Sequence, residues 1–186
     1  MHPIKQFITA APNKLCLALI TLLFAVGFAI APTQEAQAGN FEIEGQLGWN
    51  GNLWHHGGNH GFHVIISPGY RFVDWFGLFL DQGLGGHFPH HAHYFVGQTF
   101  INAKFFLPVD PVELWGKVGL GAVYHASGNV HAGAFALKLG IGVTYDIKPP
   151  IGIGVNFDYL PIFWDDFYGH ATHHGLDLMV HLRYKF

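Results

Sequence analysis

Histidine is the residue type in this sequence with the clearest capacity for chemistry. Of its fifteen histidines, all but His2 and His181 fall in or beside four glycine-rich segments. These are His55, His56, His60, His63, His87, His90, His91, His93, His125, His131, His170, His173 and His174. Neutral imidazole binds zinc, copper and nickel, and convergent segments could bring several nitrogens around one ion. The clustering predicts transition-metal binding by these residues, with no other cofactor required.

Two other interpretations of these histidines remain open. On hydrated, glycine-rich loops, histidine can serve simply as a polar residue without a ligand. Alternatively, acidification through the ordinary histidine pKa of about 6.5 would protonate the histidines together. Because the formal net charge is only −3 when they are neutral, that protonation would reverse its sign. The histidines would then respond to pH through the charge of the surface that carries them.

The elements that position the histidines are predicted by an alternation of apolar and polar residues, which is clearest at the C-terminus. A β-strand directs successive side chains to opposite faces. Val180 and Leu182 would therefore share one face, and His181 and Arg183 the other. The same alternation predicts eight strands, at residues 41–49, 62–72, 76–81, 94–107, 112–124, 135–145, 151–159 and 176–186.

The composition limits where the apolar faces of these strands can point. Only 11% of the residues are charged, and no apolar run beyond residues 15–31 is long enough for a membrane helix. A chain that spans a membrane without helices must close into a barrel. Turn residues at 73–75, 108–111 and 148–150 predict short connections at one end, and the histidine-bearing segments predict long ones at the other. The predicted fold class is all-β, an eight-stranded antiparallel up-and-down transmembrane β-barrel. A soluble lipocalin-like barrel, with its apolar face inside, is the alternative.

Residues 1–38 have the pattern of a secretory signal peptide. Two lysines precede the apolar run, and Ala36 and Ala38 offer a small-residue cleavage site. A retained membrane anchor is the alternative, because the run is long for a signal. Cleavage would leave residues 39–186 as a single barrel domain without cysteine.

The strand count, the up-and-down order and the terminal Phe186 together resemble the family of small outer-membrane barrels that includes OmpX and the transmembrane domain of OmpA. The resemblance implies an integral protein of the bacterial outer membrane, with both mature termini in the periplasm. It implies contact with outer-membrane lipid and lipopolysaccharide, and recognition of the C-terminal strand by the outer-membrane insertion machinery. We expect a non-enzymatic role in envelope structure or surface binding, with transition-metal ions as further partners. No phosphate-binding loop or basic patch suggests a nucleic-acid partner.

The polar faces of the strands would fill the interior, because an eight-stranded barrel is only wide enough for its own side chains. An unpaired buried charge is costly, so mixed charges there must pair or stay hydrated. We therefore predict a polar plug of salt bridges that includes His181, with a narrow channel as the alternative. The predicted interior charges are Glu42, Glu44, Arg71, Asp81, Lys104, Glu113, Lys117, Lys138, Asp158, Arg183 and Lys185.

A hydrolase is a further alternative, since small outer-membrane barrels include lipid A deacylases that use a histidine, a serine and an acid. His125 and Ser127 supply a base near a hydroxyl, the minimum for nucleophilic catalysis. The next strand offers no acid until Asp146, at the opposite end of the predicted barrel. Because the orienting group is missing, we predict no catalytic residues and do not expect an enzyme.

Overall fold

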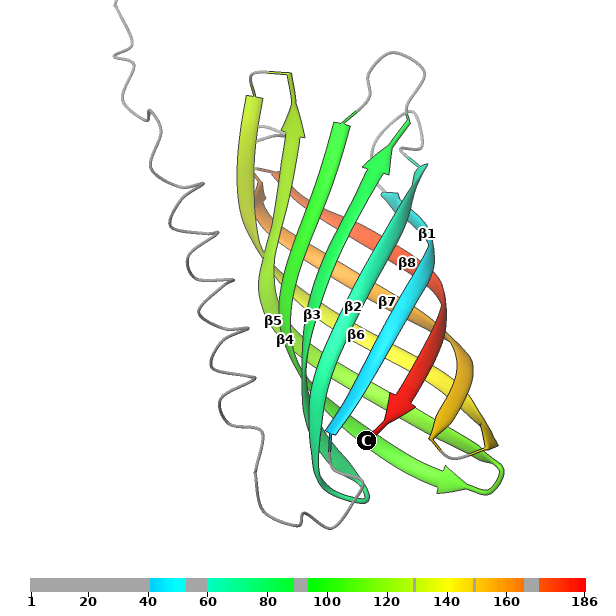
Figure 1. Cartoon of the computed structure of the whole chain (residues 1–186). Helices are drawn as coiled ribbons and strands as arrows, with labels where there is room; N and C mark the ends of the chain where they lie inside the picture. Colours follow the sequence, from blue (N-terminus) through cyan, green and yellow to red (C-terminus); the bar gives the residue numbers. More distant parts are fainter. Residues whose placement is uncertain (1–40, 53–59, 89–93, 129, 149, 166–170) are drawn as a thin grey trace, which may run out of the picture. The chain divides into compact units, whose positions relative to one another are not determined.

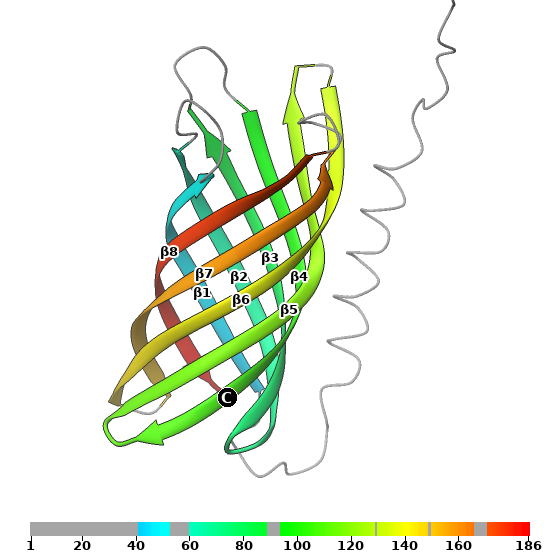
Figure 2. The same cartoon turned by 180° about the vertical axis from the view of Figure 1, so that it is seen from behind.

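Eight β-strands form a closed barrel in the computed structural model, which describes residues 41–52, 60–88, 94–128, 130–148, 150–165 and 171–186. The strands are β1 (Phe41–Asn52), β2 (His60–Val73), β3 (Phe76–His87), β4 (Tyr94–Val109), β5 (Val112–Ser127), β6 (Val130–Lys148), β7 (Ile151–Asp165) and β8 (Ala171–Lys185). Each pairs antiparallel with the next, and β8 pairs with β1 to close the barrel (Figure 1, Figure 2). This arrangement confirms the predicted fold class. No helix in the described ranges is long and apolar enough to cross a membrane.

The chain divides into two units, Met1–Ala38 and Gly39–Phe186, and the second holds the barrel. The first unit has the bounds of the predicted signal peptide and lies outside the described residues. Its cleavage therefore stays a prediction.

Side chains alternate between the outside and the inside of the barrel, with the apolar face outward. In β8, Val180 and Leu182 are 53% and 56% exposed, whereas His181 and Arg183 are at most 1% exposed. The large exposed hydrophobic side chains come from all eight strands. A soluble barrel would bury this face and expose the charged one. The lipocalin-like alternative is therefore wrong.

Tight turns join the strands at one end of the barrel, at the positions predicted from sequence. Beside the first of them, the amide of Phe106 donates a hydrogen bond to the carbonyl oxygen of Trp75 at 2.9 Å. The amide of Phe186 donates to the carbonyl oxygen of Phe41, also at 2.9 Å, so the first and last strands meet at this end. We call it the short-turn end, and the opposite one the histidine-rich end.

One connection at the histidine-rich end is shorter than predicted. β5 and β6 stay paired as far as Ser127 and Val130, and Gly128 turns the chain with a φ of 56°. This left-handed conformation favours glycine, which has no Cβ to clash. His125 and His131 therefore lie in paired strands, and the predicted third long loop is wrong. The other connections at this end lie outside the described residues, at 53–59, 89–93 and 166–170.

Aromatic side chains collect on the outer surface near both ends of the barrel. At the histidine-rich end the exposed rings, each at least 44% exposed, include Phe62, Phe95 and Tyr124. At the short-turn end, Trp75 and Phe105 stack with their ring centroids 6.5 Å apart, and Tyr184 packs edge-on against Phe186. Amphipathic rings of this kind favour the boundary between lipid and water. The outer surface thus has an apolar band between two aromatic borders, as a membrane-spanning barrel requires.

Candidate functional site

Ion pairs fill the interior of the barrel, and the charges predicted to lie there are buried or half-buried. Lys104 of β4 pairs with Glu44 of β1, and each of these side chains is only 2% exposed. Arg183 of β8 pairs with Glu113 of β5, which also accepts two hydrogen bonds of 2.9 Å from Arg71 of β2. These pairs connect strands that are not neighbours in the sheet. The charges therefore link opposite walls through the middle of the lumen.

A second ionic cluster centres on Asp81 and Asp158. The ammonium group of Lys117 lies 2.8 Å from a carboxylate oxygen of Asp158 and 3.3 Å from one of Asp81. Lys138 approaches the same Asp81 oxygen at 2.9 Å, and the hydroxyl of Ser67 donates to the other at 2.6 Å. Two ammonium groups thus balance two carboxylates, as the cost of burying an unpaired charge requires.

Aromatic side chains share the interior with these charges. Phe79, Phe106 and Trp115 form a buried cluster. The ammonium of Lys104 lies 3.8 Å from the ring centroid of Trp115, and the guanidinium of Arg71 lies 3.6 Å from that of Phe106. The negative face of an aromatic ring attracts a desolvated cation in this geometry. The predicted plug is therefore confirmed for its salt bridges, but it is partly aromatic rather than purely polar.

His181 belongs to this interior network, as predicted. Its Nε2 lies 2.9 Å from Oγ1 of Thr144, and its Nδ1 lies 3.2 Å from Oδ1 of Asn156. The ring packs against Trp115 with centroids 5.7 Å apart. Because both ring nitrogens already face polar partners, this histidine has a structural role.

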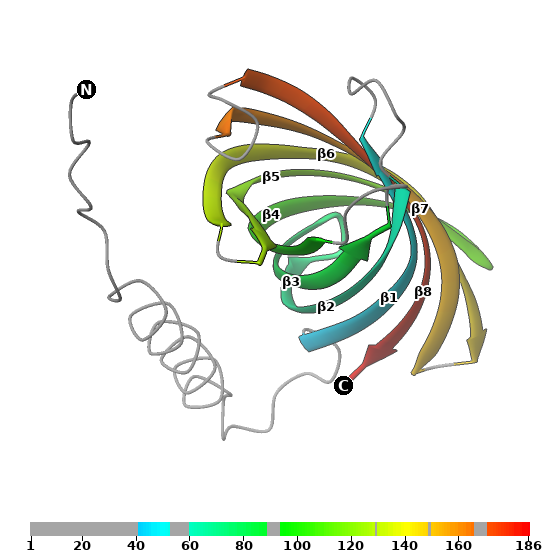
Figure 3. The same ribbon diagram turned by 90° about the horizontal axis from the view of Figure 1, so that it is seen from above.

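Four histidines that the sequence places in or beside loops lie inside the barrel at its histidine-rich end. His63, His87, His125 and His173 are between 1% and 5% exposed. They come from β2, β3, β5 and β8, and Figure 3 shows how these strands are arranged when the barrel is seen from above. The four histidines share the lining of a cavity of about 20 Å³, which has room for about one water molecule. The prediction that they project from this end is wrong. His63 lies at the inward position that the predicted strand 62–72 gave it, and β3, β5 and β8 run farther than predicted and hold His87, His125 and His173 at inward positions too.

A chain of hydrogen bonds runs through this histidine-lined cavity. The ring of His87 bonds to the hydroxyl of Tyr94 at 2.7 Å through Nδ1, and to the side chain of Asn50 through Nε2. Asn50 in turn donates to Asp177, whose carboxylate lies 3.7 Å from Nδ1 of His63. Asn50 and Tyr94 were not among the predicted site residues. Their inward strand positions were the available signal.

The remaining predicted metal ligands lie at strand ends or beyond the described residues. His60 and His131 are exposed near the start of β2 and of β6, and Nδ1 of His174 lies 2.5 Å from the hydroxyl of Tyr159. Within the described ranges, no three His, Cys, Asp or Glu side chains are arranged to hold a metal ion. The residues outside those ranges are His55, His56, His90, His91, His93 and His170. Metal binding at the histidine-rich end therefore stays a prediction.

The histidine considered for hydrolysis points into the barrel. His125 is 4% exposed, and its ring lies between those of Tyr94 and His173, at centroid distances of 5.9 and 6.0 Å. Asp146 is engaged at the short-turn end, 2.6 Å from the guanidinium of Arg183. The base is thus turned away from the lipid-facing surface and is separated from the candidate acid.

Comparisons with known proteins agree with this architecture. A family model described as the outer membrane protein beta-barrel domain matches residues 20–186. Neisserial surface protein A has a similar structure, with 17% sequence identity, a TM-score of 0.66, and coverage of 80% of this chain and 99% of that one. Ail, the attachment invasion locus protein of Yersinia pestis, has 15% sequence identity and a TM-score of 0.52. The match covers 81% of this chain and 100% of Ail. A de novo designed transmembrane β-barrel has 14% sequence identity and a TM-score of 0.50, and the match covers 82% of this chain and 100% of the designed one. No curated protein sequence matches the chain. At these identities the structural likenesses show the fold alone.

Proposed function

Since the chain belongs to the outer membrane protein β-barrel domain family and is an integral protein of the bacterial outer membrane, we propose that it acts as a non-enzymatic, non-conducting barrel in envelope structure or surface binding. In this proposal the short-turn end and both mature termini face the periplasm. The histidine-rich end then faces the cell exterior and carries the binding surface. The insertion machinery recognises the C-terminal strand β8 together with Phe186, the residue that follows it.

The packed interior is the observation that carries this proposal. Ion pairs join β1 to β4, β2 to β5, and β5 to β8 across the lumen, and aromatic rings fill space between them. An eight-stranded barrel encloses little more than its own side chains. Moving ions through the lumen would require these buried pairs to separate, at the cost of leaving charges without partners. A function on the outer surfaces of the barrel is therefore favoured over transport.

Electrical recording tests the absence of conduction. The folded, mature barrel inserted into planar lipid bilayers is expected to give no discrete conductance steps, because opening a path would separate the paired charges. Protease protection of the same preparation in vesicles serves as the control for insertion. Reproducible unitary steps from independent preparations would show that the lumen opens and would support the channel alternative.

Transition-metal capture at the histidine-rich end is a second candidate function. It is supported by the exposed positions of His60 and His131 at this end and by the further histidines of the neighbouring connections. Imidazole ligands from separate connections can bind one ion without acidic or sulfur ligands. In this second candidate function, the ligand bound by the histidine-rich end is a zinc, copper or nickel ion.

Calorimetric titration of the detergent-folded barrel with zinc, copper and nickel tests metal capture. We expect saturable binding at neutral pH and its loss below the histidine pKa of about 6.5, because protonated imidazole cannot bind a metal. Replacing His90, His91 and His93 by alanine is expected to weaken the binding at least tenfold, and His181→Gln serves as a buried control. Weak, non-saturating heats with all three metals would count against the site.

A hydrolytic function receives little support from the arrangement at the histidine-rich end. The ring of His125 is enclosed by Tyr94 and His173 inside the barrel, whereas an acyl ester of a membrane lipid would approach from outside. Nucleophilic catalysis needs base, nucleophile and orienting group within hydrogen-bond reach of one another. The non-enzymatic proposal therefore fits this geometry better than a lipid A deacylase.

A further inference from the structure

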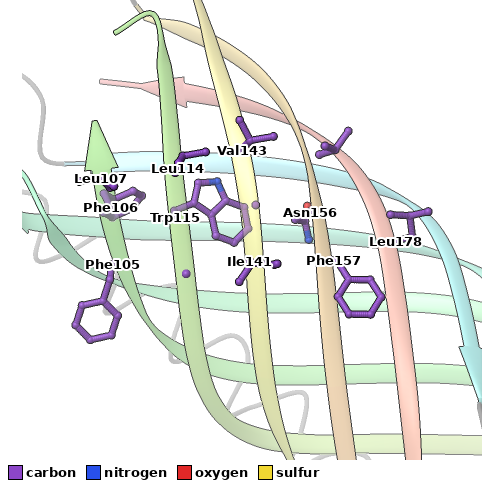
Figure 4. Close-up of a pocket in the computed structure, with 13 residues that line it drawn as sticks. Phe105, Phe106, Leu107, Leu114, Trp115, Ile141, Val143, Asn156, Phe157 and Leu178 are labelled. Carbon is purple, nitrogen blue, oxygen red and sulfur yellow. The ribbon is translucent and has the colours of Figure 1, made fainter. Parts of the chain in front are cut away.

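A groove runs across the outer wall of the barrel, on its lipid-facing surface. It has a volume of about 640 Å³ and crosses β4 to β8. Figure 4 shows apolar side chains that line it. They come from five consecutive strands, β4 to β8. Those with strongly exposed surfaces are Phe105, Leu107, Leu114, Ile141, Val155, Phe157 and Leu178. An apolar hollow of this size requires an apolar occupant, because water inside it would find few polar partners.

A missing side chain explains why the wall is hollow here. Gly116 occupies an outward position of β5, between Leu114 and Val118. Its register partners are Phe105 on β4 and Ile141 on β6, both large and exposed. A Cβ at Gly116 would meet a single neighbour within 4 Å, the carbonyl oxygen of Gly140 at 3.8 Å. The glycine thus leaves open space between two bulky flanking residues.

The occupant follows from the surface with which the groove is continuous. The exposed lining side chains belong to the outward apolar face of an integral outer-membrane protein, and that face is already in contact with lipid hydrocarbon. Phe105 and Leu107 stand shortly before the tight turn that joins β4 to β5, so the groove lies toward the short-turn end. With that end in the periplasm, as proposed above, the adjacent leaflet is the one that faces the periplasm.

We propose that this groove is a binding site for one acyl chain of a phospholipid. Seating a chain beside Gly116 restores the dispersion contacts that an unfilled hollow would forgo. It also buries apolar surface of Phe105, Ile141 and Phe157 against a partner that stays with the barrel when bulk lipid is removed. The choice of phospholipid rests on the proposed orientation, whereas the acyl-chain chemistry rests on the groove alone.

Filling the groove tests this site directly. In Gly116→Phe, the new ring projects into the open space and occupies the position of the chain. Gly45→Phe is the matched control, since Gly45 lies on β1 away from the groove and has nothing within 4 Å of its Cβ position. Each barrel is reconstituted with a mixture of phosphatidylethanolamine and lipopolysaccharide, extracted in mild detergent, and weighed by native mass spectrometry. Wild type and Gly45→Phe are expected to retain one phospholipid, and Gly116→Phe at least tenfold less.

Several outcomes would overturn the proposal. They are equal retention by Gly116→Phe and wild type, no lipid on wild type, or retention of lipopolysaccharide in place of phospholipid. A wild-type dimer that Gly116→Phe dissociates would assign the groove to a second copy of the chain. Should Gly116→Phe fail to fold, Phe157→Ala removes part of the wall instead and is expected to lower retention severalfold. Lipid retention is independent of conductance and metal binding, so this test and those of the proposed function can fail separately.

Discussion

Replacing Lys104 by methionine is expected to lower the free energy of unfolding by about 3–5 kcal/mol, because it leaves the buried carboxylate of Glu44 without its partner. Both side chains are only 2% exposed, so water cannot take over the role of the lost ammonium. Methionine keeps an unbranched apolar stem against Trp115, over which the ammonium now lies. The loss of unfolding free energy in Lys104→Met then reflects the missing positive charge and not a loss of packing against Trp115. Unfolding of the lipid-reconstituted barrel in urea, followed by tryptophan fluorescence, gives the value.

The double variant Lys104→Met with Glu44→Gln supplies the control. Removing both charges leaves neither one unpaired. The loss of unfolding free energy in the double variant is therefore expected to be smaller than the sum of the losses in the two single variants. Residues in direct contact commonly show coupling energies of about 0.5–3 kcal/mol. If the two single losses simply add, the ion pair does not exist in the folded barrel.

Placing lysine on the outer surface at Ile101 is expected to destabilise the barrel by about 2–4 kcal/mol, the cost of a basic side chain at the middle of the bilayer. Ile101 lies midway along β4, is 61% exposed, and has Leu80 and Leu120 as its register partners. A soluble barrel would tolerate a charge at such an exposed site. The sign and size of this effect therefore show whether the side chain at position 101 faces hydrocarbon. The exposed fraction of Ile101 in the barrel alone does not distinguish lipid from water.

Val109→Lys provides the matched comparison on the same strand and face. Val109 is the last residue of β4 and is 52% exposed, but it lies at the short-turn end. There the cost of a basic residue falls to about 0–1 kcal/mol. Equal effects at Ile101 and Val109, measured by the same urea titration, would argue against a membrane boundary between them.

The strands were predictable from sequence because lipid imposes one simple requirement on them. Every second side chain must be apolar, so the alternation in residues 176–186 and in the seven earlier segments marks both the strand and its outward face. The inward face is under a weaker constraint, since a narrow lumen only has to be filled and its charges paired. Phe106 and Trp115 satisfy that constraint as well as polar residues do, so the alternation could not distinguish an aromatic interior from a polar one.

The candidate site was harder to predict because the ends of the strands carry no strong pattern. Glycines beside His87 suggested a loop, yet β3 runs as far as this residue. His63 already lay on the inward face of the predicted strand 62–72. The strand alternation did carry a signal, because residues an even number of positions apart lie on the same face of a strand. His87 therefore shares the face of Asp81, and His125 shares the face of Lys117. Extending the alternation of each strand toward the histidines would have placed them inside. Which partners they contact depends on how distant strands align, and that is set only when the barrel closes.

The hydrogen bond between Phe186 and Phe41 also has a meaning for assembly. It marks the seam where the two ends of the described sheet join, so β1 and β8 are unpaired edges until the last strand arrives, and unpaired edges invite pairing with other chains. Contacts so distant in sequence form slowly, because the chain between them must be ordered first. The interior pairs Lys104–Glu44 and Arg183–Glu113 cross from one side of the seam to the opposite wall. The pair Arg183–Glu113 involves β8 and can form only after this last strand arrives, which ties part of the interior network to closure of the barrel.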